Sequence, residues 1–454
     1  MKTMKSGAFL GLALSMIGAC VVSSSQAEDC SRETLATEVR QSLEKDLLEV
    51  WYPRVVDEED GGYMTDYDAD WNLMPRQNKM IVTQARHLWT SSRLLQFFPE
   101  KTYLRTVADY GFAFLRDKMW DHEHGGFYWL VDKQGNPIKA STFGKRKQAY
   151  GNAFGIYALV AYYEVTGDEE ALELAKKTFL WLEKNSYDEA FGGYYNFLDA
   201  DGTPIKRPFF RQYPKDQNSS IHLLEAFTSL YHVWKDPLLE ERLSGLYDLI
   251  RDKMIDERGF VRLFFEKDWT PVSLADASEK KYKKYVLLDH VSFGHDVEIA
   301  YLMLEAKEAL GKPDDADTLV LGKKMLDHAL DHGWDAEHPS IFDGGRYQNG
   351  VCSIVLRSKE WWAEAELLNT LVIMANHYPD DPRHYFAKAC QVWEYINTYL
   401  IDHDRGGWYG DGLDTTPEAA DRRKAHMWKG AYHDSRAMMN VYHSLTGNCP
   451  DKGE

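Results

Sequence analysis

Long hydrophobic runs are scarce in this sequence. The 454 residues contain one, from Ala8 to Val22, and no other stretch approaches the ~18 apolar residues that a membrane-spanning helix needs. Basic residues are also outnumbered: 53 lysines and arginines face 71 aspartates and glutamates, for a net charge of −18. The chain therefore lacks the basic face that nucleic acids and anionic membranes require. These absences exclude a polytopic membrane protein and a nucleic-acid-binding protein.

Cysteine is sparse as well, with five residues in the whole chain. No CxxC or HExxH spacing and no phosphate-binding loop occurs, so the sequence predicts a protein without a metal or other cofactor. Cys352 and Cys390 are interpreted as buried free thiols.

Residues 1–27 read as an export signal, because two lysines precede the apolar run and small residues follow it. Two outcomes stay open: cleavage after Ala27, or lipidation of Cys20, whose Ile-Gly-Ala-Cys context resembles a bacterial lipobox. Either outcome predicts an exported protein without a membrane span: periplasmic, secreted, or lipid-anchored at the cell envelope. Such a compartment permits disulfides. We expect residues 28–454 to form a single catalytic domain.

A short motif recurs along the chain: an aspartate followed four residues later by Gly-Gly-aromatic. Clear copies begin at Asp57, Asp121, Asp188 and Asp402. A degenerate copy runs from Asp256 to Phe260, and a sixth joins Asp335 to Gly344-Gly345 through a longer loop. Regular spacing of this kind is typical of repeat architectures, and we assign these loops a structural role.

Between the loops, each unit contains one helix that is apolar all round and one that is amphipathic. A helix without a polar face is buried on every side, whereas an amphipathic helix shows one face to water. The predicted inner helices are 79–97, 146–165, 216–234, 288–310, 358–378 and 429–447. The predicted outer helices are 31–50, 101–118, 168–184, 236–254, 314–331 and 381–399.

Six alternating helix pairs predict an all-α fold, a closed (α/α)6 toroid. An open solenoid is the alternative, but the polar capping units that it needs at its ends are not visible. In the toroid, polar and aromatic side chains near the N-terminal ends of the inner helices face one mouth and form a ligand pocket. They are Arg86, Asn152, Asn218, His222, His295, Glu298, Trp362, Glu366 and His433.

Histidines supply the chemistry of this mouth. An imidazole with its ordinary pKa of about 6.5 both removes and returns protons near neutral pH. Two histidines on separate inner helices can serve opposite faces of one carbon, as an epimerase requires, while an arginine steadies the enediolate oxygen. Interpretations without a catalytic role stay open. The histidines could be core residues with hydrogen-bond partners, Arg86 could pair with an acid, and Trp361-Trp362 could pack in the interior.

At this point the chain resembles the cellobiose 2-epimerases, within the N-acylglucosamine 2-epimerase superfamily of (α/α)6 barrels. The resemblance extends from about Trp51 to His443. Its most specific segments are 85–90, 218–225, Gly-His-Asp-Val-Glu at 294–298, Trp-Trp-Ala-Glu-Ala-Glu at 361–366, and 428–433.

The resemblance implies roles for individual residues. Arg86 would bind substrate, His295 and His433 would exchange the C2 proton, and His222 would assist in ring opening or in holding the enediolate. The substrate would be a mono- or disaccharide. The positions that match sugar contacts, with the neighbouring Trp361 counted among them, are Asn218, Glu298, Trp361, Trp362, Glu366 and Trp428.

Several positions depart from the family pattern. Asn218-Ser-Ser-Ile-His222 lacks the family's middle histidine, and Glu364 stands where glutamine is usual. Gln84 and Asn152 occupy positions that are often asparagine and glutamine. The sugar therefore stays open among cellobiose, mannobiose, and free glucose or mannose, and the export signal favours an oligosaccharide.

Three rival functions remain. An aldose–ketose isomerase of the mannose isomerase type would use similar residues on the same toroid. A glycoside hydrolase would need a pair of carboxylates as acid and base, and the mouth is richer in histidine. A sugar-binding protein without catalysis is the third alternative.

Cys30 opens the first outer helix, and Cys449 follows the last inner helix. Because the first and last units of a closed ring are neighbours, we expect a Cys30–Cys449 disulfide that closes the toroid. The alternative is that the two chain ends never meet.

Overall fold

The computed structural model describes residues 30–138, 146–209, 213–313 and 315–447. Within them, six inner helices surround a central axis: α3 (Ile81–Phe97), α5 (Ala149–Thr166), α7 (Gln217–Val233), α10 (Phe293–Ala309), α12 (Trp361–His377) and α14 (His433–Thr446). Six helices cover them outside: α1 (Arg32–Ser42), α4 (Tyr103–Phe114), α6 (Glu169–Asn185), α8 (Pro237–Leu249), α11 (Ala316–Gly333) and α13 (Tyr385–Tyr395).

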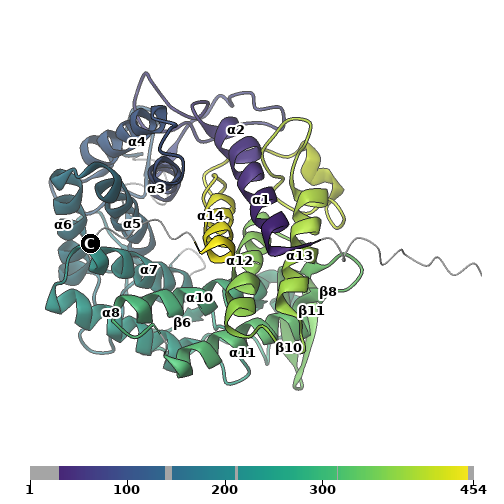
Figure 1. Ribbon diagram of the computed structural model, residues 1–454. Helices are drawn as coiled ribbons and strands as arrows, with labels where there is room; N and C mark the ends of the chain where they lie inside the picture. Colours follow the sequence, from purple (N-terminus) through teal and green to yellow (C-terminus); the bar gives the residue numbers. More distant parts are fainter. Residues whose placement is uncertain (1–29, 139–145, 210–212, 314, 448–454) are drawn as a thin grey trace, which may run out of the picture.

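The inner helices form a closed ring. Each packs against the next in chain order, and α14 contacts both α12 and α3 (Figure 1). The first outer helix, α1, packs against α14, so the beginning and the end of the ring meet. The toroid predicted from the sequence is confirmed, with element bounds close to those expected. The main shifts are at two inner helices: α10 begins at Phe293 instead of residue 288, and α14 begins at His433 instead of residue 429.

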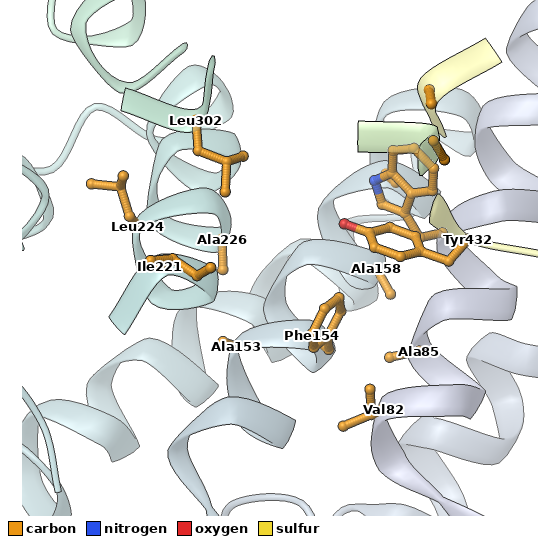
Figure 2. Packing of buried hydrophobic residues seen from close by; sticks show 14 of the residues in the cluster. Val82, Ala85, Ala153, Phe154, Ala158, Ile221, Leu224, Ala226, Leu302 and Tyr432 are labelled. Carbon is orange, nitrogen blue, oxygen red and sulfur yellow. The ribbon is translucent and has the colours of Figure 1, made fainter. Parts of the chain in front are cut away.

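Burial explains the two layers. Every residue from Ala149 to Ile156 in α5 is buried, whereas α6 alternates buried leucines and alanines with exposed lysines and glutamates. Figure 2 shows small side chains, such as Ala85 and Ala153, on the inner helices, with Phe154 and Tyr432 between them. None of the helices in the described part of the chain has the length and apolarity of a membrane span.

The repeated loops are held by buried ion pairs. In each clear copy the glycines adopt positive φ, and the aspartate pairs with a lysine shortly before the next inner helix, as in Lys79–Asp57 at 2.7 Å. The equivalent pairs are Lys147–Asp121, Lys215–Asp188, Lys359–Asp335 and Lys424–Asp402. In the degenerate fourth unit, two arginines of the loop itself, Arg258 and Arg262, bind Asp256.

A second brace ties several of the inner helices to their loops, and it corrects one expectation. Asn152, predicted to face the mouth, is fully buried, and its Oδ1 accepts a hydrogen bond of 2.8 Å from the backbone N–H of Phe127. Gln84 and Asp296 accept from the N–H groups of Tyr63 and Val261 in the same way. A backbone donor in a buried loop needs such a partner, so this position serves the fold.

The fifth repeat differs from the sequence interpretation. Gly344 and Gly345 do not form the turn after Asp335; they lie in strand β10 (Gly344–Gln348) of a hairpin with β11 (Val351–Leu356). The turn instead joins β8 (Trp334–Asp335) to β9 (Ser340–Ile341), which pair directly. The hairpin also pairs with β7 (Val291–Ser292), just before α10.

The disulfide also differs from the prediction. Cys30 is bonded to Cys390 on α13, with Cα atoms 6.2 Å apart. A disulfide does join the first unit of the ring to the last part of the chain, but its second cysteine lies on an outer helix. Cys390 is therefore not a free thiol. Cys352 is free and partly buried. Cys449 and the predicted export segment with Cys20 lie outside the described residues.

Candidate functional site

Carboxylates from three inner helices, α7, α10 and α12, converge on one arginine, Arg436, in the first turn of α14. Its side chain is 3% exposed, and its guanidinium donates to Glu225, to Glu298 at 2.7 Å and to Glu366 at 2.6 Å. It also donates to the hydroxyl of Tyr432 at 2.5 Å. Charges buried this deeply are tolerated only when paired, and here one cation serves three carboxylates.

His433 and Glu366 form a close pair beside this centre. His433 Nδ1 lies 2.6 Å from Glu366 Oε1. Burial and the nearby Arg86 hold the pKa of His433 well below its usual value, and burial raises the pKa of Glu366 despite the attraction of Arg436. The contact fixes which ring nitrogen of His433 faces Glu366 and leaves Nε2 free to meet a ligand.

His222 has a similar partner on its own helix. Its Nδ1 lies 2.9 Å from Glu225 Oε2, three residues later on α7. Burial alone would raise the pKa of Glu225, but Arg436, His222 and Tyr432 outweigh it and lower that pKa to about 2. His222 and His433 are therefore joined through their glutamates to the same arginine.

His295 stands apart from the arginine network. Its Nδ1 lies 2.7 Å from the Ser292 hydroxyl at the start of α10, and burial lowers the pKa of His295 to about 4. The imidazole is therefore neutral over the physiological range and able to accept a proton. The Trp362 ring lies against both His295 and His433, with ring centroids 4.7 Å and 5.7 Å away. The tryptophan thus places the two histidines beside one site.

Arg86 offers a cation without an acidic partner. Its Nη2 donates to the Tyr150 hydroxyl at 3.0 Å, and its guanidinium lies over the rings of Phe154 and Tyr432. Among the described residues, no carboxylate lies within salt-bridge distance of it, and its Nε has no partner. The alternative of an acid-paired Arg86 is therefore wrong, and the group is available to an anionic or polarised oxygen.

The remaining predicted residues lie at different depths. Glu298 is buried beside Arg436, Asn218 is partly exposed in the first turn of α7, and Trp428 is 45% exposed at the rim. Trp361 is buried under the ammonium group of Lys429, away from the histidines that Trp362 contacts. Its surroundings match the core-packing interpretation.

Sequence reasoning missed Arg436. It lies three residues after His433 and therefore on the same helix face, and a lone arginine on the inward face of an inner helix is the signal that was available. Tyr150 and Tyr432, which contact Arg86, were also not singled out.

Three of these groups have the geometry of a metal site. The ligand atoms of Glu298, Glu366 and His433 lie within 4.8 Å of one another, which the sequence did not indicate. Arg436 binds both carboxylates, however, so a cation already occupies the centre of this cluster. The absence of a metal requirement stays a prediction.

The arrangement suits proton transfer at carbon. It combines a neutral imidazole, a second imidazole hydrogen-bonded to a glutamate, and a guanidinium without an acidic partner. These are the groups needed to remove a proton beside a carbonyl, stabilise the resulting enediolate, and return a proton.

Comparisons with known proteins agree with this chemistry. The family model described as N-acylglucosamine 2-epimerase (GlcNAc 2-epimerase) matches residues 62–437. A cellobiose 2-epimerase of Bacteroides fragilis is 29% identical over 90% of this chain and 99% of its own. The solved cellobiose 2-epimerase of Spirochaeta thermophila is 30% identical, with a TM-score of 0.77 over 92% of this chain and 98% of that one.

A D-mannose isomerase of Thermobifida fusca is more distant, at 25% identity over 73% of this chain and 78% of its own.

Proposed function

Because the chain belongs to the N-acylglucosamine 2-epimerase family, we propose that its histidine-lined pocket interconverts C2 epimers by two-histidine proton transfer. The protein is a carbohydrate epimerase, and so an isomerase. The observation that carries the mechanism is Trp362, which lies against His295 and His433 at once.

The proposed reaction begins with the open-chain aldose. One histidine removes the C2 proton, and the electron pair moves into the C1 carbonyl to give an enediolate. The other histidine delivers a proton to the opposite face of C2, and the carbonyl re-forms. Bonds and charges balance without an oxidant or reductant.

The electrostatics support a division of labour between the two histidines. Neutral His295 is ready to accept the C2 proton. We assign proton return to His433, because the Glu366 carboxylate at its Nδ1 would stabilise the imidazolium that delivers the proton. Arg86 lies ready for the enediolate oxygen. We assign ring opening to His222, whose Nδ1 is held by Glu225.

The substrate class is an aldose or the reducing-end residue of an oligosaccharide, of the glucose and mannose type. Cellobiose and mannobiose are the first candidates, because the cellobiose 2-epimerases are the closer relatives in sequence. Asn218, Glu298, Glu366, Trp362 and Trp428 supply the proposed sugar contacts.

The test is to incubate the purified protein with mannose, glucose, cellobiose or mannobiose in D2O and to follow C2–H by NMR. Appearance of the C2 epimer with deuterium at C2 supports the proposal. His295→Ala and His433→Ala should each abolish this exchange with unchanged circular dichroism, whereas His122→Ala, on an exposed histidine, should not. Near wild-type exchange in either pocket variant refutes the two-histidine mechanism.

An isomerase is the second candidate, favoured by the D-mannose isomerase relative. It would return the proton at C1, and a ketose product would identify it. Sugar binding without any loss of C2–H would identify a non-catalytic binding protein.

We also propose that the protein is exported, on the strength of residues 1–27. Cell fractionation tests this proposal, and mass spectrometry of the mature N-terminus separates cleavage after Ala27 from lipidation of Cys20. A cytoplasmic protein with an intact N-terminus would refute export.

A further inference from the structure

A second hollow lies at the rim of the toroid. It has a volume of about 670 Å³ and lies between residues 66–78, which precede α3, and residues 423–427, which precede α14. Its size is within the range of ordinary small-molecule sites, roughly 300–1,000 Å³. None of its lining residues belongs to the histidine and arginine network described above. We call it the rim pocket.

The rim pocket shares a wall with the epimerase pocket. Met427 lines it directly before Trp428, and Leu130 lines it directly after Trp129. The rings of Trp129 and Trp428 lie 5.8 Å apart, and Trp428 also faces Tyr150, the partner of Arg86. The exposed Trp428 therefore stands between the two hollows.

The position of this wall is held by the first inner helix. The Thr83 hydroxyl on α3 donates to the carbonyl of Met427, and Arg86 follows one turn later on the same helix. A ligand that extends out of the epimerase pocket over Trp428 would meet the rim pocket next.

The lining suits an uncharged sugar ring. Four side chains make an apolar surface for the C–H face of the ring: Met74, Pro75, Leu130 and Met427. Asp66 and Arg423, paired at 2.9 Å, and the neighbouring Arg76 offer planar polar groups to ring hydroxyls. Asp66 offsets the charge of Arg423, and Arg76 remains as a further hydrogen-bond donor to ring hydroxyls.

We propose that the rim pocket is a distal subsite for an oligosaccharide longer than a disaccharide. The reducing-end residue lies among the histidines, the chain crosses Trp428, and a further uncharged sugar residue lies in the rim pocket. This inference rests on the proposed epimerase function and adds the chain length of its substrate. It assigns Arg76 and Arg423 to substrate selection, remote from the chemistry.

The test compares kcat/KM for disaccharides and trisaccharides of the cello and manno series. In the wild-type protein, the trisaccharide should exceed the disaccharide by about tenfold. The double variant Arg76→Ala/Arg423→Ala should lose most of this ratio through a higher KM for the trisaccharide. Arg422→Ala is the matched control: it is the adjacent exposed arginine, is paired with Asp411 and Glu418, and does not line the pocket. It should keep the wild-type ratio.

Equal kcat/KM for the disaccharide and the trisaccharide in the wild-type protein would refute the subsite. An equal loss of kcat/KM on both sugars in the double variant would refute it as well. If no sugar is turned over, the epimerase proposal has failed. Calorimetric titration of cellotriose and mannotriose then tests the subsite alone. Weaker trisaccharide binding in the double variant than in Arg422→Ala supports it, and identical binding overturns it. If the protein preferred a trisaccharide that ends in a uronate over the neutral trisaccharides, and salt removed that preference, the proposal of an uncharged sugar in the rim pocket would be wrong.

Discussion

His433 and Glu366 come from different inner helices, yet His433 Nδ1 and Glu366 Oε1 lie only 2.6 Å apart. The same carboxylate oxygen accepts from Arg436 at 2.6 Å, and the other oxygen accepts from the Tyr301 hydroxyl at 2.8 Å. The histidine is thus oriented by a carboxylate that is itself held on both sides. Such second partners determine which ring nitrogen carries the proton and where the free nitrogen points.

Glu366→Gln should therefore lower kcat while leaving the pocket in place. Glutamine keeps the shape of the side chain, but it carries no negative charge to stabilise the His433 imidazolium. Loss of the carboxylate that orients a catalytic histidine costs up to about 10⁴-fold in kcat in a serine protease, and we expect at least about a hundredfold here. Steady-state kinetics of Glu366→Gln and of the control Glu189→Gln, on an exposed glutamate, would measure this. A kcat within threefold of wild type would show that the pair plays no part in proton transfer.

The pH dependence of kcat/KM follows from the state of His295. A general base works only when deprotonated, so activity is lost as pH falls through its pKa. Burial lowers the pKa of His295 to about 4, and the acidic limb should lie near that value instead of at the ordinary 6.5. Epimerisation rates measured from pH 3.5 to 8, after checking that the protein stays folded, should be level between pH 5.5 and 7. A midpoint near pH 6.5 would contradict a base in this environment.

Much of the architecture was predictable because the same loop motif and helix pair recur along the sequence. Four of the loops repeat an aspartate and two glycines, and the inner helices between them are mostly apolar, so the toroid follows from periodicity. His222, His295, His433, Glu298 and Glu366 were found because charged or titratable groups are conspicuous on apolar helices. The structure brings all of these except His295 into one connected network, with His295 joined to it through Trp362.

The wrong predictions concern residue types that can play either of two structural roles. Asn152 is as polar as a ligand-binding residue, and only its bond to the Phe127 N–H reveals that it braces a loop. The partner of Cys30 depends on which outer helix closes the seam, and repeat spacing does not specify that. The fifth Gly-Gly pair lies in an inserted hairpin, where the same dipeptide forms a strand instead of a turn.

Activity should survive removal of metal ions, even though Glu298, Glu366 and His433 cluster closely. Arg436 already binds both carboxylates, and a divalent ion would have to displace a guanidinium held by three acids. Epimerase assays before and after dialysis against EDTA should give the same rate, with metal content checked by elemental analysis. Loss of activity that a divalent ion restores would instead make the cluster a metal site.

The last prediction concerns Glu364, the position at which the family usually has glutamine. Its Oε1 accepts from the Ile341 N–H, its Oε2 has no partner, and burial raises its pKa well above the ordinary value. Burial therefore favours the neutral form of this carboxyl group in the folded protein, and that form has the shape of glutamine. The unfolded chain ionises near pH 4.5, so wild-type stability falls as pH rises above that value until the folded-state pKa is reached.

Glu364→Gln should remove this penalty. At pH 4 the variant and the wild-type protein should unfold at similar temperatures, because the carboxyl is largely protonated in both states. Between pH 4.5 and 7 the advantage of the variant should grow by at most about 1.4 kcal/mol per pH unit. Thermal unfolding followed by circular dichroism across this range measures the difference. Glu189→Gln, on an exposed glutamate, should show no such trend, and a constant gap for Glu364→Gln at all pH values would mean that Glu364 is ionised in the folded protein.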